Sequence, residues 1–230
     1  MPDRLYGRRR GHPLRARQQR LMDIALPRLH LPDGALPDPL SAFGERRGAL
    51  WLEIGFGGGE HAAALAEAHP DVAMIAAEVF ENGICSLLSR LVPEGDEATS
   101  PPPANLRLWT RDARHLLAAL PPGSLDRVYL MFPDPWPKAR HDKRRFVHPA
   151  NLALVARALR PGGEWRIASD HPVYQDWVDQ VMGSQDLFAL HAHHRGTAEG
   201  DRPEGWFPTR YEAKAHREGR TPRYWVWQRR

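Results

Sequence analysis

The clearest chemical signal in this sequence is a glycine-rich run that follows a short apolar stretch. Residues 49–54 predict a buried strand, and Gly55, Gly57 and Gly59 alternate directly after it. Alternating glycines let a backbone turn tightly and approach a ligand closely. Between a strand and a helix such a loop favours a nucleotide-type ligand, although the glycines alone would also suit a plain turn.

Acidic residues follow the next two predicted strands. Glu78 comes at the end of residues 72–79, where a carboxylate can accept hydrogen bonds from both hydroxyls of a ribose. Asp112 follows residues 106–110, and could either receive the exocyclic amine of an adenine or only cap the next helix. The sequence leaves both roles of Asp112 open, and they can hold together.

The choice of nucleotide ligand depends on Glu53, which stands before the first glycine. A carboxylate there would repel a pyrophosphate but would suit the amino-acid part of S-adenosylmethionine. The G-x-G-x-G spacing also differs from the G-x-G-x-x-G of dinucleotide-binding loops. We therefore expect S-adenosylmethionine as the cofactor. A dehydrogenase with a nicotinamide dinucleotide is the weaker alternative.

A proline-rich loop follows the fourth predicted strand, residues 125–131. It reads Phe-Pro-Asp-Pro-Trp-Pro-Lys over residues 132–138. Its prolines fix an extended backbone, so Asp134 is held in a defined direction. Trp136 could stack on a planar base or pack structurally. This loop is predicted to hold the group that receives the methyl.

Two basic clusters interrupt a chain whose net charge is only +4. Cations following the proline-rich loop would grip phosphates, whereas most such runs are simply solvated. Their position beside the predicted site favours RNA as the partner. The cations of this run are Lys138, Arg140, Lys143, Arg144 and Arg145. The N-terminal cluster comprises Arg4, Arg8, Arg9, Arg10, Arg15, Arg17 and Arg20.

Further polar residues lie near the C-terminus. Asp170 is another acid at a strand end, and Thr209-Arg210-Tyr211-Glu212 has near capping-box spacing, which also suits a plain helix start. The histidines His191, His193 and His194 lack the spacing of a metal site, and none is predicted.

The order of predicted elements indicates an α/β fold. Strands alternate with helices, which implies a mostly parallel seven-stranded sheet with helices on both faces. Residues 1–47, rich in Arg and Pro, predict a basic N-terminal arm, and residues 48–230 predict one domain. The predicted strands are residues 49–54, 72–79, 106–110, 125–131, 164–168, 187–194 and 223–228.

The bulk composition excludes several classes of protein. No apolar run is long enough to span a membrane, and the arginine-rich start excludes a secretory signal. The single cysteine, Cys85, cannot form an internal disulfide, so a cytoplasmic location is expected. Monomer and homodimer both remain open.

The motifs together resemble the bacterial tRNA (guanine-N7)-methyltransferases. The resemblance covers residues 49–230, and the block 132–145 is its most specific part. It implies a Rossmann-like class I methyltransferase fold and methylation of guanine N7 at position 46 of the tRNA variable loop. The other matching segments are residues 52–57, 78–80, 169–171 and 209–214.

The resemblance also implies roles for single residues. Glu53, Glu78, Asp112 and Asp134 would bind S-adenosylmethionine with the loop glycines, and Asp134 would also be the active-site residue. Lys138, Asp170 and the segment Thr209–Glu212 would contact the substrate, and the cations of residues 140–145 the RNA. Ala139 and Asp142 depart from the family pattern and lower its positive charge. A non-catalytic RNA-binding protein and a small-molecule or protein methyltransferase remain alternatives.

Overall fold

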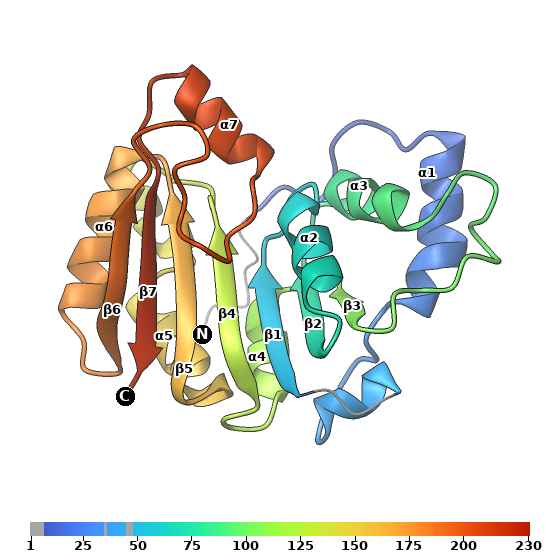
Figure 1. Cartoon of the computed structure of the whole chain (residues 1–230), viewed down its shortest axis with the longest axis horizontal. Helices are drawn as coiled ribbons and strands as arrows, with labels where there is room; N and C mark the ends of the chain where they lie inside the picture. Colours follow the sequence, from blue (N-terminus) through green and yellow to red (C-terminus); the bar gives the residue numbers. More distant parts are fainter. Residues whose placement is uncertain (1–6, 35, 45–47) are drawn as a thin grey trace. The chain divides into compact units, whose positions relative to one another are not determined.

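The computed structural model describes residues 7–34, 36–44 and 48–230. The chain forms two compact units, residues 1–120 and 121–230, which are drawn from blue to green and from green to red in Figure 1. Arg4 and the predicted boundary at residue 47 lie outside the described residues.

Unit 1 is built on three parallel strands. They are ordered β3-β2-β1, and every residue of β2 is buried, as expected of a parallel strand that is covered on both faces. A helix follows each strand, so the carboxyl ends of the strands lead into the loops that carry Gly55, Glu78 and Asp112. The elements are β1 (Ala49–Ile54), α2 (Glu60–Ala68), β2 (Val72–Ala77), α3 (Glu81–Leu91), β3 (Leu106–Trp109) and α4 (Ala113–Ala119).

The N-terminal segment packs into unit 1, so the prediction of a basic arm is not confirmed. The side chains of Leu21, Leu29, Leu31 and Phe43 are buried. The backbone of Leu108 in β3 donates to Leu29 and accepts from Leu31, each at 2.9 Å. The buried apolar side chains therefore hold this segment against β3, although its composition is rich in proline. The segment contains α1 (Ala16–Arg20), η1 (Leu21–Ala25), η2 (Leu26–Arg28) and η3 (Pro39–Phe43).

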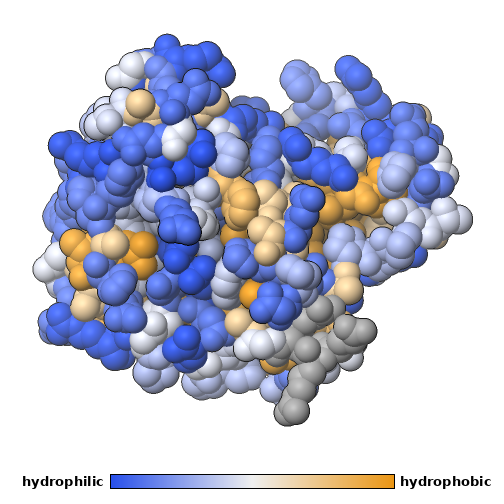
Figure 2. All heavy atoms as spheres, viewed as in Figure 1, coloured by the Kyte–Doolittle hydropathy of each residue, from blue (hydrophilic) through white to orange (hydrophobic). Residues whose placement is uncertain are grey.

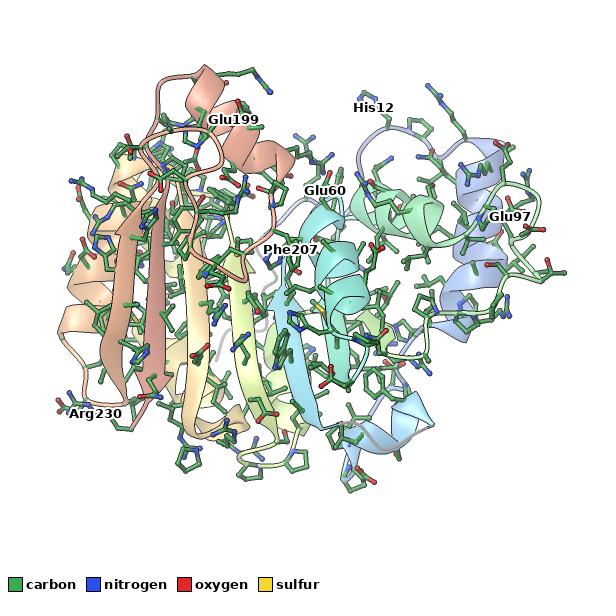
Figure 3. All side chains as sticks on the ribbon, in the orientation of Figure 1. His12, Glu60, Glu97, Glu199, Phe207 and Arg230 are labelled. Atoms are coloured by element: carbon green, nitrogen blue, oxygen red, sulfur yellow. The ribbon has the colours of Figure 1, made fainter. Side chains whose placement is uncertain are left out.

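The acidic, proline-rich loop 93–105 is tied to this N-terminal segment. Glu97, labelled in Figure 3, lies beside α1 and forms a 3.2 Å ion pair with Arg20. Its own backbone amide and the Arg20 guanidinium lower the pKa of Glu97. Arg17 also donates to the carbonyl of Val92 at 3.0 Å. Two arginines of the N-terminal cluster therefore bind other segments of unit 1, Arg20 through Glu97 and Arg17 through Val92.

Unit 2 is a mixed sheet with strand order β4-β5-β7-β6. β4 and β5 are parallel, whereas β7 runs antiparallel to both of its neighbours. The helices α5 and α6 lie behind these strands in Figure 1, and α7 lies above the carboxyl ends of β4 and β5. The elements are β4 (Leu125–Met131), η4 (Ala139–Arg144), α5 (Pro149–Ala158), β5 (Leu159–Ser169), α6 (Pro172–Gly183), β6 (Phe188–Arg195), α7 (Arg210–Arg217) and β7 (Arg223–Arg229).

The described residues thus contain the seven predicted strands, and the α/β class is confirmed. The largest difference in bounds is β5, which begins at Leu159 rather than at residue 164, because Leu159 already pairs with Leu125 before an irregularity in register. Among the described residues, no helix is long and apolar enough to cross a membrane.

Candidate functional site

The glycine loop of unit 1 has the backbone that only glycine adopts readily. Gly55, Gly57 and Gly59 have φ values of 71°, 59° and 79°. A Cβ on Gly59 would lie 2.6 Å from Leu87, whereas a Cβ on Gly55 would meet nothing within 4 Å. Gly55 is also exposed, although the four residues before it are buried. The loop therefore has open space beside its first glycine.

Glu78 ties this loop to the start of α3. One of its carboxylate oxygens accepts from the amide of Gly57 at 2.8 Å. The other accepts from the amides of Val79 and Phe80 at 2.7 and 3.0 Å. α3 approaches so closely that a Cβ on Gly83 would lie 2.3 Å from the carbonyl oxygen of Gly57. Sequence reasoning missed Gly83, for which the only signal was a glycine inside a helical pattern.

Glu53 is buried at the end of β1 and paired with a histidine. Its side chain and that of His61 are each only 1% exposed, and Nδ1 of His61 lies 3.1 Å from Glu53 Oε2. His61 is the second residue of α2 and lies in the turn that directly follows the glycine loop. A lone histidine in a helix carries no motif, so the sequence gives no signal for His61. The pair fixes the direction of the Glu53 carboxylate.

Asp112 caps α4, as one of its two predicted roles requires. Its carboxylate accepts from the amide of Arg114 at 2.9 Å and from the Arg114 guanidinium at 3.0 Å. Burial acts to raise the pKa of Asp112, but the hydrogen bonds and charge of Arg114 outweigh it, so the pKa is lowered. Its predicted contact with an adenine stays a prediction.

The proline-rich loop of unit 2 carries two strained residues. Phe132 and Trp136 have φ values of 50° and 43°, which are rare for residues with a Cβ. Asp134 lies between them and is exposed. Within the described part of the chain its carboxylate has no hydrogen-bond or ion-pair partner. A free carboxylate is thus presented on a stiff and strained loop.

The aromatic ring of Trp136 is contacted by two side chains that follow it in the sequence, Arg144 and His141. The guanidinium of Arg144 lies 4.8 Å from the ring centroid, which is cation–π geometry. His141 meets the ring edge-on at 5.9 Å. Trp136 therefore has packing contacts within the protein. Its stacking on a base stays a prediction.

Positive charge is concentrated on the η4 turn. Partial burial, together with the charges of Arg144, Arg140, Lys138 and Lys143, lowers the pKa of His141. The lowered pKa favours the neutral form of the His141 ring near pH 7. Lys138, Arg140 and Lys143 are exposed, as phosphate-binding side chains must be.

Arg145 differs from the other cations of this run because it is buried, with 5% of its surface exposed. It donates from Nε to the carbonyl of Pro135 at 3.1 Å and from Nη2 to that of Trp136 at 2.9 Å. The same guanidinium lies 4.7 Å from the ring centroid of Trp177 in α6. The structure places Arg145 under the loop rather than on the surface with Arg140.

Asp170 follows β5 and is held by Arg220, whose Nε lies 2.7 Å from a carboxylate oxygen. The Glu218 and Asp170 carboxylates raise the pKa of Arg220 further. No local pattern in the sequence indicates this contact, because Arg220 and Asp170 are 50 positions apart.

The segment Thr209–Glu212 is a capped helix start, as its capping-box spacing allowed. Thr209 Oγ1 accepts from the amide of Glu212 at 3.1 Å. Glu212 is buried, and Arg202 donates to both of its carboxylate oxygens at 3.1 Å. Arg210 and Tyr211 remain exposed, with the guanidinium 5.2 Å from the ring centroid. Hydrophilic residues cover the region of α7 in Figure 2.

Metal ligands are not grouped in the described chain. No cluster of three or more His, Cys, Asp or Glu side chains suited to a metal ion occurs among the residues that the structure describes. His194 instead pairs with Asp201 at 2.8 Å.

Comparison with known proteins identifies the family. The model of a family described as putative methyltransferase matches residues 47–223. A tRNA (guanine-N(7)-)-methyltransferase from Granulibacter bethesdensis is 64% identical over 100% of this chain and 96% of its own length. One from Rhodospirillum rubrum is 46% identical over 99% and 88% of the two chains. This chain belongs to the tRNA (guanine-N(7)-)-methyltransferase family.

Solved structures of methyltransferases share the fold. A 16S rRNA methyltransferase, KamB, superposes with a TM-score of 0.61 at 14% identity, over 86% of this chain and 95% of its own. Members of the family are S-adenosylmethionine-dependent enzymes, and S-adenosylmethionine is the cofactor of this one. The residues present fit it, because the positive-φ glycines and the open space at Gly55 leave room for a ligand against the backbone.

Proposed function

We propose that this enzyme transfers a methyl group to N7 of the guanine at position 46 in the variable loop of tRNA. The product is 7-methylguanosine. The exposed carboxylate of Asp134, on a strained loop followed by a turn rich in cations, is the observation that carries the proposal. The names of the relatives support tRNA and guanine N7 as the substrate. A tRNA substrate also suits a cytoplasmic enzyme.

Cofactor binding is assigned to unit 1. Gly55, Gly57 and Gly59 are assigned to close approach of the backbone to the ligand, and Glu53 to its amino-acid part. Glu78 is assigned to the ribose hydroxyls, with one oxygen also holding the Gly57 amide. Asp112 is assigned to the adenine amine. When bound, S-adenosylmethionine supplies an electrophilic methyl group on a sulfonium.

The reaction needs no general base, because guanine N7 carries a lone pair and no proton. The enzyme must instead align the base with the methyl group and stabilise charge as it develops. The base becomes positively charged as the methyl arrives, and the Asp134 carboxylate would stabilise that charge and accept hydrogen bonds from the guanine edge. Asp134 is also assigned to the binding of S-adenosylmethionine.

RNA binding is assigned to residues of unit 2. Lys138, Arg140, Lys143 and Arg144 would neutralise phosphates next to the target base. Asp170, held by Arg220, and the start of α7 are assigned to the substrate. In α7, the exposed Arg210 and Tyr211 are suited to direct contact, whereas Thr209 and Glu212 would act from buried positions.

The test measures transfer of labelled methyl from S-adenosylmethionine to an unmodified tRNA transcript. The control is the same transcript with guanine 46 replaced by adenine. We expect label on the first transcript alone. Equal label on both would keep the methyltransferase but overturn the position, and label on neither would favour a non-catalytic RNA-binding protein.

A further inference from the structure

Arg145 lies in a run of cations but has an environment unlike theirs. Only 5% of its surface is exposed, whereas Arg140 and Lys143 are exposed. No carboxylate pairs with it among the described residues. Burying a guanidinium without an opposite charge is costly unless other groups satisfy it. The groups that do so here identify what Arg145 holds.

Two of those groups are the backbone carbonyls of consecutive residues, on either side of the Cα of Trp136. Nε donates to the carbonyl of Pro135 at 3.1 Å and Nη2 to that of Trp136 at 2.9 Å. Trp136 has the unfavourable φ of 43°, which costs free energy unless surrounding contacts enforce it. The fork of the guanidinium therefore clamps the strained end of the loop, directly after Asp134.

The third group is the indole of Trp177, whose centroid lies 4.7 Å from the guanidinium carbon. Trp177 is fixed in turn, because its Nε1 donates to the carbonyl of Val147 at 2.5 Å. The ring of His148 stacks on it at 6.3 Å with an interplanar angle of 23°. Arg145 thus connects the loop to α6. Binding of a phosphate would not require this contact.

We propose that Arg145 is a positioning residue for Asp134 and does not bind RNA phosphate. It holds the Pro135–Trp136 backbone against Trp177, and this contact fixes the direction of the neighbouring carboxylate. The proposal rests on the proposed function of Asp134. Arg145 thereby receives a role different from the RNA binding that the family resemblance implies for the cations of residues 140–145.

A cavity next to Arg145 makes the proposal testable by chemical rescue. Its volume is about 340 Å³, it opens to solvent, and its lining includes Pro137, Asp142 and Asp176 together with Arg145 and Trp177. In an Arg145→Ala variant a small cation can enter from this side. A guanidinium ion can then reform the two carbonyl contacts and the stacking on Trp177, whereas ammonium has no planar fork.

The experiment compares Arg145→Ala, Arg145→Lys and Arg140→Met by two measurements. One is the single-turnover rate of methyl transfer at saturating tRNA and S-adenosylmethionine, and the other is tRNA affinity as a function of salt. We expect both Arg145 variants to lose about 100-fold in rate, the scale of a small misplacement of reacting groups, with an unchanged salt slope. Millimolar guanidinium, but not ammonium, should restore the rate of Arg145→Ala.

Arg140→Met should behave in the opposite way. We expect its tRNA affinity to fall and its salt slope to decrease by about 1, whereas the Arg145 variants keep the salt slope of the unchanged enzyme. Arg160→Met is the control for loss of a surface arginine, because Arg160 is exposed and pairs with Asp126 at the far end of β5. A reduced salt slope in Arg145→Ala, or a rate that guanidinium does not restore, would overturn the positioning role.

A measurement without methyl transfer keeps this proposal separate from the proposed function. Hydrogen exchange of the amides of Asp134, Trp136 and Lys138 reports on the loop directly, since the residues between them are prolines. We expect faster exchange in Arg145→Ala and recovery with guanidinium. If the unchanged enzyme transfers no methyl to tRNA, the proposed function fails, and this exchange result still decides whether Arg145 holds the loop. Unaltered exchange in the variant would contradict it.

Discussion

The glycine loop of unit 1 and the proline-rich loop of unit 2 follow strands in the same way but treat their carboxylates differently. Glu53 and Glu78 are already engaged by their own protein, through His61 and through three backbone amides. Asp134 is exposed and has no partner within the described residues. One region is completed by internal hydrogen bonds, whereas the other leaves its carboxylate free.

The difference follows from what each region is proposed to do. A cofactor site benefits from a loop whose shape is set in advance, because less freedom is then lost on binding. A group that stabilises a developing charge must reserve its interaction for the reacting base. The stiffness of the proline-rich loop replaces the hydrogen bonds that would otherwise orient Asp134.

Neutralising Asp134 should have the largest effect on methyl transfer. It tests the proline-rich loop, whose carboxylate has no partner within the described residues. We expect Asp134→Asn to lower the single-turnover rate by about 100- to 1,000-fold, the scale of a lost preorganised electrostatic contact. The free energy of unfolding should change little, because the side chain is exposed. Asp186→Asn is the matched control, another exposed carboxylate without a partner in the described chain. Near-normal single turnovers in Asp134→Asn would remove the catalytic role.

Adding one methyl group to Gly83 should have the next largest effect. It tests the glycine loop of unit 1, which internal hydrogen bonds hold in place. In Gly83→Ala the new Cβ meets the carbonyl of Gly57, so α3 must move away from the glycine loop. We expect a loss of about 1–3 kcal/mol in stability and weaker binding of S-adenosylmethionine. Calorimetric titration and chemical denaturation measure the two effects.

Gly183→Ala is the control for Gly83→Ala, because both glycines are helical but a Cβ on Gly183 meets nothing within 4 Å. Alanine there should be neutral or slightly stabilising. Equal effects of the two substitutions on cofactor binding would show that α3 does not hold the glycine loop.

The smallest expected effect concerns Asp112, whose lowered pKa makes its contribution depend on pH. Because the folded-state pKa lies below the unfolded one, the ionised carboxylate stabilises the fold above the unfolded pKa, and this is lost as pH falls through the folded pKa. We expect Asp112→Asn to cost about 1 kcal/mol at neutral pH. The cost should shrink as pH falls below about 4, the ordinary pKa of an aspartate, toward the lower pKa of the folded state. Urea unfolding of both proteins across this range measures it, and a cost independent of pH would point to the cap geometry alone.

Predictions from local patterns succeeded where the physics is local. The seven strands, the positive-φ glycines and the helix caps of Asp112 and Thr209 all depend on neighbouring residues. The expected basic arm was not confirmed, because composition does not show whether spaced leucines will find a strand to pack against. Leu29 and Leu31 do so on Leu108, far along the chain.

The sequence by itself determined the family, the order of the elements and the residue types available at the end of each strand. Only the tertiary structure decided which of those side chains are free. The sequence assigns Arg140 and Arg145 alike to the RNA, and it does not show that Glu78 is held by backbone amides while Asp134 has no partner within the described residues. The contacts that separate them come from Trp177, from the Gly57 amide and from other groups distant in the chain. Burial is a property of packing between elements, so a local run of residues cannot encode it.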